Sequence, residues 1–204
     1  MNLIDDLIEQ GWLKSPRIIE AFQAVKREDF MSDDYKGAAE INEAFPIGCG
    51  QTISQPLVVA FMLEKLEPKS GSKALDIGSG SGWTSALLAH IVGEKGKVIG
   101  IEIIPELKGF GENNAEKYGF IEQDRLKFIL GDGRKGYPLE APYDRILCSA
   151  SADKVPLAWG KQLKVNGKIV MPINNSIWVF TKRADNSFAS EEYPGFVFVP
   201  LIKA

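Results

Sequence analysis

The chain has 204 residues, 45% of them hydrophobic and 25% charged, which is typical of one globular domain. Its net charge of −3 argues against the basic surface that nucleic acids or anionic membranes require, and its two cysteines are too few for a disulfide scaffold. The chain contains no apolar run long enough to span a membrane and its N-terminus is acidic, so we expect a monomeric cytoplasmic protein without nucleic-acid or membrane partners.

The N-terminal part of the chain, residues 1–45, is predicted to be helical. Ser15 and Pro16 form a typical helix start, because serine caps the first turn and proline has no N–H to leave unpaired there. Four apolar residues then recur at helical spacing: Ile18, Ile19, Phe22 and Val25. The pattern predicts an amphipathic helix, with a shorter one before it.

A polar loop with two glycines follows at about residues 46–56, and a further helix pattern runs from Leu57 to Leu66. The sheet pattern begins at residue 73, with the first predicted strand. We therefore divide the predicted single catalytic domain into two parts. An N-terminal helical extension with its loop occupies 1–66, and the cofactor-binding sheet core occupies 67–204.

The most informative motif joins Asp76 to a glycine-rich turn, in the run Ala-Leu-Asp-Ile-Gly-Ser-Gly-Ser-Gly over 74–82. A strand, closely spaced glycines and a helix pattern let the backbone approach a ligand at the carboxyl end of a parallel strand. The spacing differs from the G-x-G-x-x-G of dinucleotide sites, and the Asp76 carboxylate would repel a pyrophosphate. S-adenosylmethionine (SAM) fits better, because it carries an ammonium and a sulfonium but no phosphate.

Glu102 supplies a second carboxylate, at the end of the next predicted strand. A carboxylate in this position can accept hydrogen bonds from both hydroxyls of a ribose. The alternative is a glycine-rich turn that holds no ligand. The combination of Asp76, three glycines and Glu102 favours the SAM site.

Beyond the glycine motif, strand and helix patterns alternate along the chain. Such alternation predicts an α/β fold, in which helices cover both faces of a parallel sheet. The predicted strands are 73–77, 97–102, 125–130, 143–148 and 168–172, and the predicted helices are 82–92, 105–118 and 155–164.

The last two apolar runs, 177–182 and 196–201, are separated only by the short polar segment 183–195. Because no helix fits easily between them, we predict that they pair as an antiparallel, hairpin-like ending. The sequence therefore predicts a mostly parallel sheet with a reversed final strand.

His90, the one histidine, lies in an apolar stretch of the helix after the glycine motif and is interpreted as structural. A single histidine argues against Ser-His-Asp and Cys-His catalysis and against histidine-based zinc sites. We therefore expect no metal and a reaction that needs no imidazole.

Three motifs resemble those of the protein-L-isoaspartate O-methyltransferase family. The specific one is Gln-Thr-Ile-Ser-Gln-Pro over 51–56, which alone would be read as a surface turn. The others are 131–137 with 141–144, and the ending 198–201. The resemblance extends over about residues 15–203, and the chain is identified as a member of this family, of bacterial type.

The resemblance implies the Rossmann-like fold of SAM-dependent methyltransferases. It also implies transfer of a methyl group from SAM to the free α-carboxylate of L-isoaspartyl residues in damaged proteins and peptides, leaving S-adenosyl-L-homocysteine (SAH). The ester would collapse to a succinimide, which hydrolyses partly to normal aspartate. A carboxylate is already ionised at pH 7, so the reaction needs placement rather than a general base.

The resemblance further implies roles for matching residues. Ser54 is the catalytic candidate, whose hydroxyl would orient the isoaspartyl group. The other substrate-binding candidates are Thr52, Ile53, Val199 and Leu201. The cofactor-binding candidates are Asp76, Gly78, Ser79, Gly80, Glu102, Asp132 and Gly133, of which Asp132 and Gly133 would hold the adenine edge. For Asp132, a plain Gly-Asp-Gly turn is the alternative.

The stretch 148–153 departs from the family, because it is more polar and lacks an expected proline. It leaves open a methyltransferase of the same fold that acts on a different peptide or small-molecule carboxylate. A non-catalytic SAM- or peptide-binding module would be favoured by loss of Asp76, Glu102 or Ser54, and all three are present. A nicotinamide oxidoreductase is disfavoured by the glycine spacing.

Overall fold

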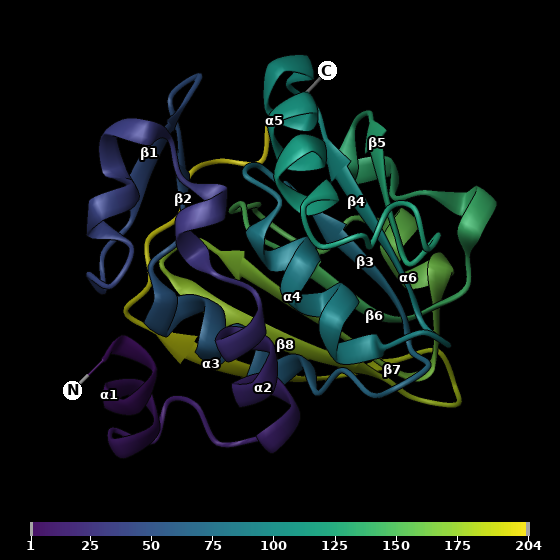
Figure 1. The fold of residues 1–204 in the computed structure, drawn as a ribbon. Helices are drawn as coiled ribbons and strands as arrows, with labels where there is room; N and C mark the ends of the chain where they lie inside the picture. Colours follow the sequence, from purple (N-terminus) through teal and green to yellow (C-terminus); the bar gives the residue numbers. More distant parts are fainter. Residues whose placement is uncertain (1, 203–204) are drawn as a thin grey trace.

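The computed structural model describes residues 2–202, built around a seven-stranded sheet (Figure 1). Its strands are β3 (Lys73–Ile77), β4 (Lys97–Glu102), β5 (Leu126–Leu130), β6 (Tyr143–Cys148), β7 (Leu163–Ile173), β8 (Ser176–Lys182) and β9 (Phe188–Pro194). They lie in the order β5-β4-β3-β6-β7-β8-β9. Strands β3 to β7 run parallel, β8 is antiparallel to both its neighbours, and β9 beyond it returns to the common direction. The predicted α/β fold with a mostly parallel sheet is confirmed, although the reversed strand is not the last.

Helices pack on both faces of this sheet. The helices are α1 (Leu3–Glu9), α2 (Pro16–Ala24), α3 (Pro56–Leu66), α4 (Trp83–Val92), α5 (Pro105–Glu116) and α6 (Leu157–Gln162), with 3-10 turns η1 (Arg27–Phe30), η2 (Asp33–Ala38), η3 (Gly133–Lys135) and η4 (Pro138–Glu140). Helices α3, α4 and α5 contact one face, with α2 packed on α3 and α4, and the Trp159 side chain of α6 belongs to the core of the other. Among residues 2–202, no helix has both the length and the apolar character to cross a membrane.

Strand β3 shows how the sequence produces two cores. Its side chains alternate between the faces, so that Ala74 joins the core beneath α4 while Leu75 and Ile77 join the core beneath α6. All three are fully buried, as expected for the centre of a parallel sheet covered on both sides. Asp76 lies on the Ala74 face and is also fully buried, so this strand places a carboxyl group inside the protein.

The topology also creates a crevice at one edge of the sheet. From β3 the chain first builds β4 and β5 on one side, and then crosses to place β6 and β7 on the other. Ligands of open α/β sheets bind at such a reversal, outside the carboxyl ends of the strands. The glycine motif follows β3, and Glu102 ends the adjacent β4, so both lie at this edge.

The N-terminal part differs from its prediction. Helices α1 and α2 occur within 1–45, but they are followed only by the short 3-10 turns η1 and η2. The predicted loop 46–56 contains an antiparallel hairpin of β1 (Phe45–Gly48) and β2 (Gln51–Ile53). Positive φ angles at Gly48, Cys49 and Gly50, of 93°, 52° and 70°, reverse the chain between the two strands. The division at residue 66 stays a prediction.

The predicted pairing of 177–182 with 196–201 is wrong. Strand β8 pairs instead with β9, because the chain turns back early, where Asn186 adopts a φ of 64° and the Arg183 N–H donates to the Ser187 carbonyl. At Gly195, φ is 99° and the strand ends. The apolar run that follows leaves the sheet, and Figure 1 shows it passing the β1–β2 hairpin as a yellow trace. We call residues 196–202 the C-terminal strap.

Candidate functional site

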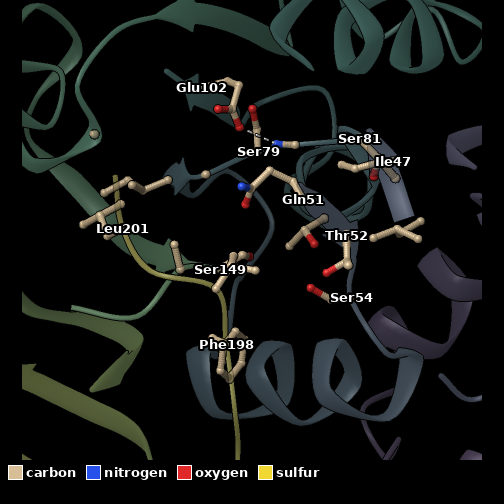
Figure 2. A pocket seen from close by; sticks show the side chains of 18 of the residues that line it. Ile47, Gln51, Thr52, Ser54, Ser79, Ser81, Glu102, Ser149, Phe198 and Leu201 are labelled. Atoms are coloured by element: carbon tan, nitrogen blue, oxygen red, sulfur yellow. Dashed lines mark hydrogen bonds between the residues drawn. The ribbon is translucent and has the colours of Figure 1, made fainter. Parts of the chain in front are cut away.

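A cavity of about 380 Å³ lies at the carboxyl ends of β3, β4 and β6. Three segments far apart in the sequence enclose it, namely the β1–β2 hairpin, the glycine turn 78–82 and the C-terminal strap. Figure 2 shows Thr52 and Ser54 on the hairpin side, Ser79 and Glu102 toward the sheet, and Phe198 and Leu201 on the strap. The predicted substrate residues and most of the predicted cofactor residues therefore surround one space.

The glycine turn is held by the backbone of α5. A Cβ atom built on Gly82 would lie 2.6 Å from the Gly111 carbonyl oxygen, and one on Gly111 would lie 2.8 Å from the Gly80 carbonyl oxygen. The Asn114 amide also donates to the Ser81 carbonyl, at 3.1 Å. Glycine is required at these two facing positions because the backbones are too close for any side chain.

This contact predicts opposite effects for two alanine substitutions in α5. Gly111→Ala is expected to lower the free energy of unfolding by about 2 kcal/mol, because its methyl group would push the glycine turn away. Gly109→Ala, on the same helix with nothing within 4 Å of its Cβ position, is expected to raise it by about 0.5–1 kcal/mol. Urea unfolding measures the change in the free energy of unfolding for both variants. Changes in the same direction would contradict the close approach of the two backbones.

Glu102 fixes the turn from the other side. Its Oε2 accepts the Gly80 N–H at 2.9 Å, and its Oε1 accepts the N–H groups of Ile103 and Ile104 at 2.7 and 3.0 Å. The side chain is nearly buried but lines the cavity (Figure 2). One carboxylate therefore joins the glycine turn to the entry of α5, and remains within reach of a ligand.

Asp76 lies beneath the turn and does not line the cavity. The Ser85 hydroxyl donates to its Oδ2, whereas Oδ1 is buried without a hydrogen-bond partner among residues 2–202. Burial raises the pKa of Asp76 to about 7, with the Ser85 hydrogen bond opposing the rise and the Glu102 charge adding to it. The role of Asp76 at the methionine end of SAM stays a prediction, because its side chain is fully buried and does not line the cavity in this structure.

Of the two residues predicted to hold the adenine edge, Gly133 lies at the cavity and Asp132 does not. Gly133 lines the cavity, where a Cβ atom would lie 2.4 Å from Ile77 Cγ2. The Asp132 side chain instead caps η3 and pairs with Arg134, at 2.6 Å from Oδ2 to Nη2, which lowers the pKa of Asp132. Its contact with an adenine therefore stays a prediction, and the plain Gly-Asp-Gly turn stays the alternative.

The stretch 148–153, which departs from the family, holds the C-terminal strap. The Ser151 N–H donates to the Val199 carbonyl at 2.8 Å, and the Leu201 N–H donates to the Ser151 carbonyl at 2.7 Å. Ser149 and Ala150 line the cavity beside it. Val199 and Leu201 also line the cavity as predicted, although from the strap and not from a strand.

Several lining residues were missed by sequence reasoning. Gln51 lies in the Gln-Thr-Ile-Ser-Gln-Pro motif and Phe198 in the apolar ending 198–201. Both motifs had been singled out, so these two residues could have been predicted from the sequence. Ile47 and Ser149 carried none, because only the folded hairpin and the end of β6 bring them to the cavity.

The site fits SAM in its donors and acceptors. The Ser79 hydroxyl lines the cavity, is buried, and has no hydrogen-bond partner within residues 2–202. Glu102 offers carboxylate oxygens to hydroxyls or an ammonium, and the bare backbone of Gly78 and Gly80 allows a close approach. Glu102 is the one charged residue that lines the cavity among residues 2–202, and its carboxylate favours a ligand without phosphates.

Comparison with known proteins gives one consistent result. The family model for Protein-L-isoaspartate(D-aspartate) O-methyltransferase (PCMT) matches residues 1–204. Proteins named protein-L-isoaspartate O-methyltransferase from Methanopyrus kandleri and Thermococcus sibiricus are 43% and 42% identical to this chain, over 98% and 99% of it and 90% and 92% of their own length. A Plasmodium falciparum protein described as a beta-aspartate methyltransferase (PCMT), crystallised with SAH, superposes with a TM-score of 0.89 at 25% identity, over 100% of both chains.

Proposed function

This chain belongs to the protein-L-isoaspartate(D-aspartate) O-methyltransferase family, and we propose that it methylates the free α-carboxylate of L-isoaspartyl residues in damaged proteins and peptides, with SAM as the methyl donor. The resulting ester would enter repair through a succinimide. The expectation of a bacterial type is not supported, since the similar curated relatives are archaeal.

One observation carries the proposal: a single cavity joins the hairpin with the Gln-Thr-Ile-Ser-Gln-Pro motif to the glycine turn with Glu102. When bound, SAM supplies an activated methyl group on its sulfonium. On the cofactor side, Glu102, Ser79 and the backbone of Gly80 would hold it. On the substrate side, the Ser54 hydroxyl donates a hydrogen bond to the isoaspartyl carboxylate and fixes its direction.

The chemistry agrees with the residues of the cavity. A carboxylate of ordinary pKa is ionised at pH 7, so no group of the protein needs to remove a proton. The chain contributes orientation, which can supply several kcal/mol of the barrier reduction, and it excludes water with Ile47, Phe198 and Leu201.

The substrate assignment is tested with two synthetic peptides that differ only in one L-isoAsp or L-Asp residue. We expect a base-labile methyl ester on the isoAsp peptide alone. If SAH binds but neither peptide is methylated, the cofactor site stands and the substrate assignment falls, in favour of another carboxylate.

Ser54→Ala is expected to lower kcat/KM for the isoAsp peptide at least about tenfold, because a hydrogen bond to a charged group is lost. The Kd for SAH, measured by titration calorimetry, should stay within about twofold. Ser149→Ala, which removes a hydroxyl from another wall of the same cavity, is the control. An equal loss in both variants would contradict a specific role for Ser54.

We further propose that the enzyme acts as a monomer in the cytoplasm. The hairpin, the glycine turn and the strap of one chain together enclose the cavity, so the chemistry calls for no second copy. Sedimentation equilibrium should give a mass near 22.5 kDa, and a stable dimer with higher specific activity would contradict this.

A further inference from the structure

Arg27 is a buried cation that the methyl-transfer chemistry does not use. It begins η1, only 6% of it is exposed, and within residues 2–202 no carboxylate forms a salt bridge with it. Burial lowers the pKa of Arg27 to about 10, so the guanidinium still carries its charge at neutral pH. The nearby Glu40 charge opposes this fall in the pKa, and hydrogen-bond partners supply further compensation for the buried charge.

Its partners are four backbone carbonyls on both sides of the β1–β2 hairpin. Nη1 donates to Ala39 at 3.2 Å and to Ile41 at 3.0 Å, and Nη2 donates to Glu43 at 2.6 Å and to Ser54 at 3.2 Å. The first three carbonyls precede β1, and that of Ser54 directly follows β2. One planar group therefore ties together the two ends of the hairpin, including the residue that presents the substrate-side hydroxyl.

The same guanidinium lies against two aromatic rings. Its central carbon is 5.6 Å from the ring centroid of Phe45, at the start of the hairpin, and 5.5 Å from that of Trp83. Trp83 is the first residue of α4 and follows Gly82 directly. Arg27 thus connects the hairpin that holds the substrate-side residues with the helix that begins at the glycine turn. It does not line the cavity itself.

We propose that Arg27 is a positioning residue for Ser54, which fixes the Ser54 backbone relative to the glycine turn and thereby sets the direction of the substrate carboxylate. The inference rests on the proposed function. Lysine cannot replace arginine here, because it has three donors on one atom and no planar group to lie between the two rings. A shift of about 1 Å in a positioning element can cost up to about 100-fold in rate.

The test compares Arg27→Lys with Arg145→Lys. Arg145 is also buried, at 8% exposure, and donates to two backbone carbonyls, those of Glu67 and Asp144, but it lies in β6 toward the amino end of the sheet. Arg27→Lys is expected to lower kcat/KM for the isoAsp peptide about tenfold, while the Kd for SAH changes less than about twofold. Arg145→Lys should leave both unchanged, although it lowers the melting temperature.

A double-mutant cycle separates positioning from general stability. If Arg27 acts through the Ser54 hydroxyl, Arg27→Lys should cost little more in a Ser54→Ala background, so the two effects are not additive. Additive losses would overturn the proposal. Loss of SAH affinity in parallel with activity would also overturn it, because it would show a general disturbance of the fold.

Hydrogen exchange gives a readout that does not depend on the reaction. Arg27→Lys should speed amide exchange in peptides covering 45–55, and Arg145→Lys should not. If Arg27→Lys leaves the amide exchange of 45–55 unchanged, the inference is overturned, even if the enzyme repairs isoaspartate. If exchange is faster but the enzyme methylates neither peptide, the proposed function is overturned, while the role of Arg27 in fixing the Ser54 backbone stands. If Arg27→Lys and Arg27→Gln both unfold at 10 °C with SAH present, Arg27 serves stability and the proposal falls.

Discussion

Asp76→Asn is expected to gain about 3 kcal/mol of stability relative to the native protein as the pH rises from about 4 to 7. Burial raises the pKa of Asp76 from an ordinary 3.8 to about 7, so the folded protein retains a proton that the unfolded chain releases. Below pH 3.8 both states are protonated and Asp76 has no effect. Between the two values the native protein loses stability as pH rises, and above about pH 7 the loss is constant. Asparagine cannot ionise, so the variant lacks this loss.

Urea unfolding at pH 4, 5, 6 and 7 measures the difference between the variant and the native protein. Only its change with pH matters, so any constant cost of the amide cancels. Asp185→Asn is the control, because hydrogen bonds from Ser187 lower the pKa of this exposed carboxyl. The difference in the free energy of unfolding between Asp185→Asn and the native protein should not change between pH 5 and 7. If the difference for Asp76→Asn is also constant over this range, Asp76 is ionised in the folded protein throughout it, which would contradict the prediction.

Glu102→Ala should weaken SAH binding at least about 100-fold, equivalent to about 2.7 kcal/mol. The substitution removes the acceptor of three backbone N–H groups, at Gly80, Ile103 and Ile104, as well as a carboxylate that faces the cavity. Each donor left without a partner costs about 1–3 kcal/mol where water cannot reach it. The glycine turn and the entry of α5 therefore lose their common anchor, and the ligand loses its polar contact.

Titration calorimetry with SAH measures this effect. Glu106→Ala, which removes an exposed carboxylate from the first turn of α5, is the control and should bind SAH normally. Glu102→Gln should fall between the two, because it keeps one acceptor oxygen and loses the charge. SAH binding by Glu102→Ala within threefold of the native protein would contradict the anchor role.

The chain itself determined the elements whose signals are local. Short apolar runs bounded by turn residues and followed by helix patterns predicted the central strands, so β3, β4 and β6 have the predicted bounds. Proline at a helix start and a change of hydrophobic period are also local, and they placed α4 and α5 within a few residues. The carboxyl ends of adjacent parallel strands meet at one edge, which is why the sequence could bring the glycine turn and Glu102 together.

Tertiary structure alone decided what depends on contacts between distant segments. The apolar ending 196–201 has the composition of a strand, but the turn at Asn186 had already returned the chain to the sheet edge, so these residues closed the cavity instead. The glycine motif and the family resemblance marked Asp76 and Asp132 as ligand contacts, which stay predictions, but only the fold shows that Asp76 is fully buried and that Asp132 pairs with Arg134. Arg27 was not among the candidate site residues of the sequence. Its four carbonyl partners lie 12 to 27 residues away in the sequence. Every residue has a backbone carbonyl, so only the fold determines which carbonyls lie near the guanidinium.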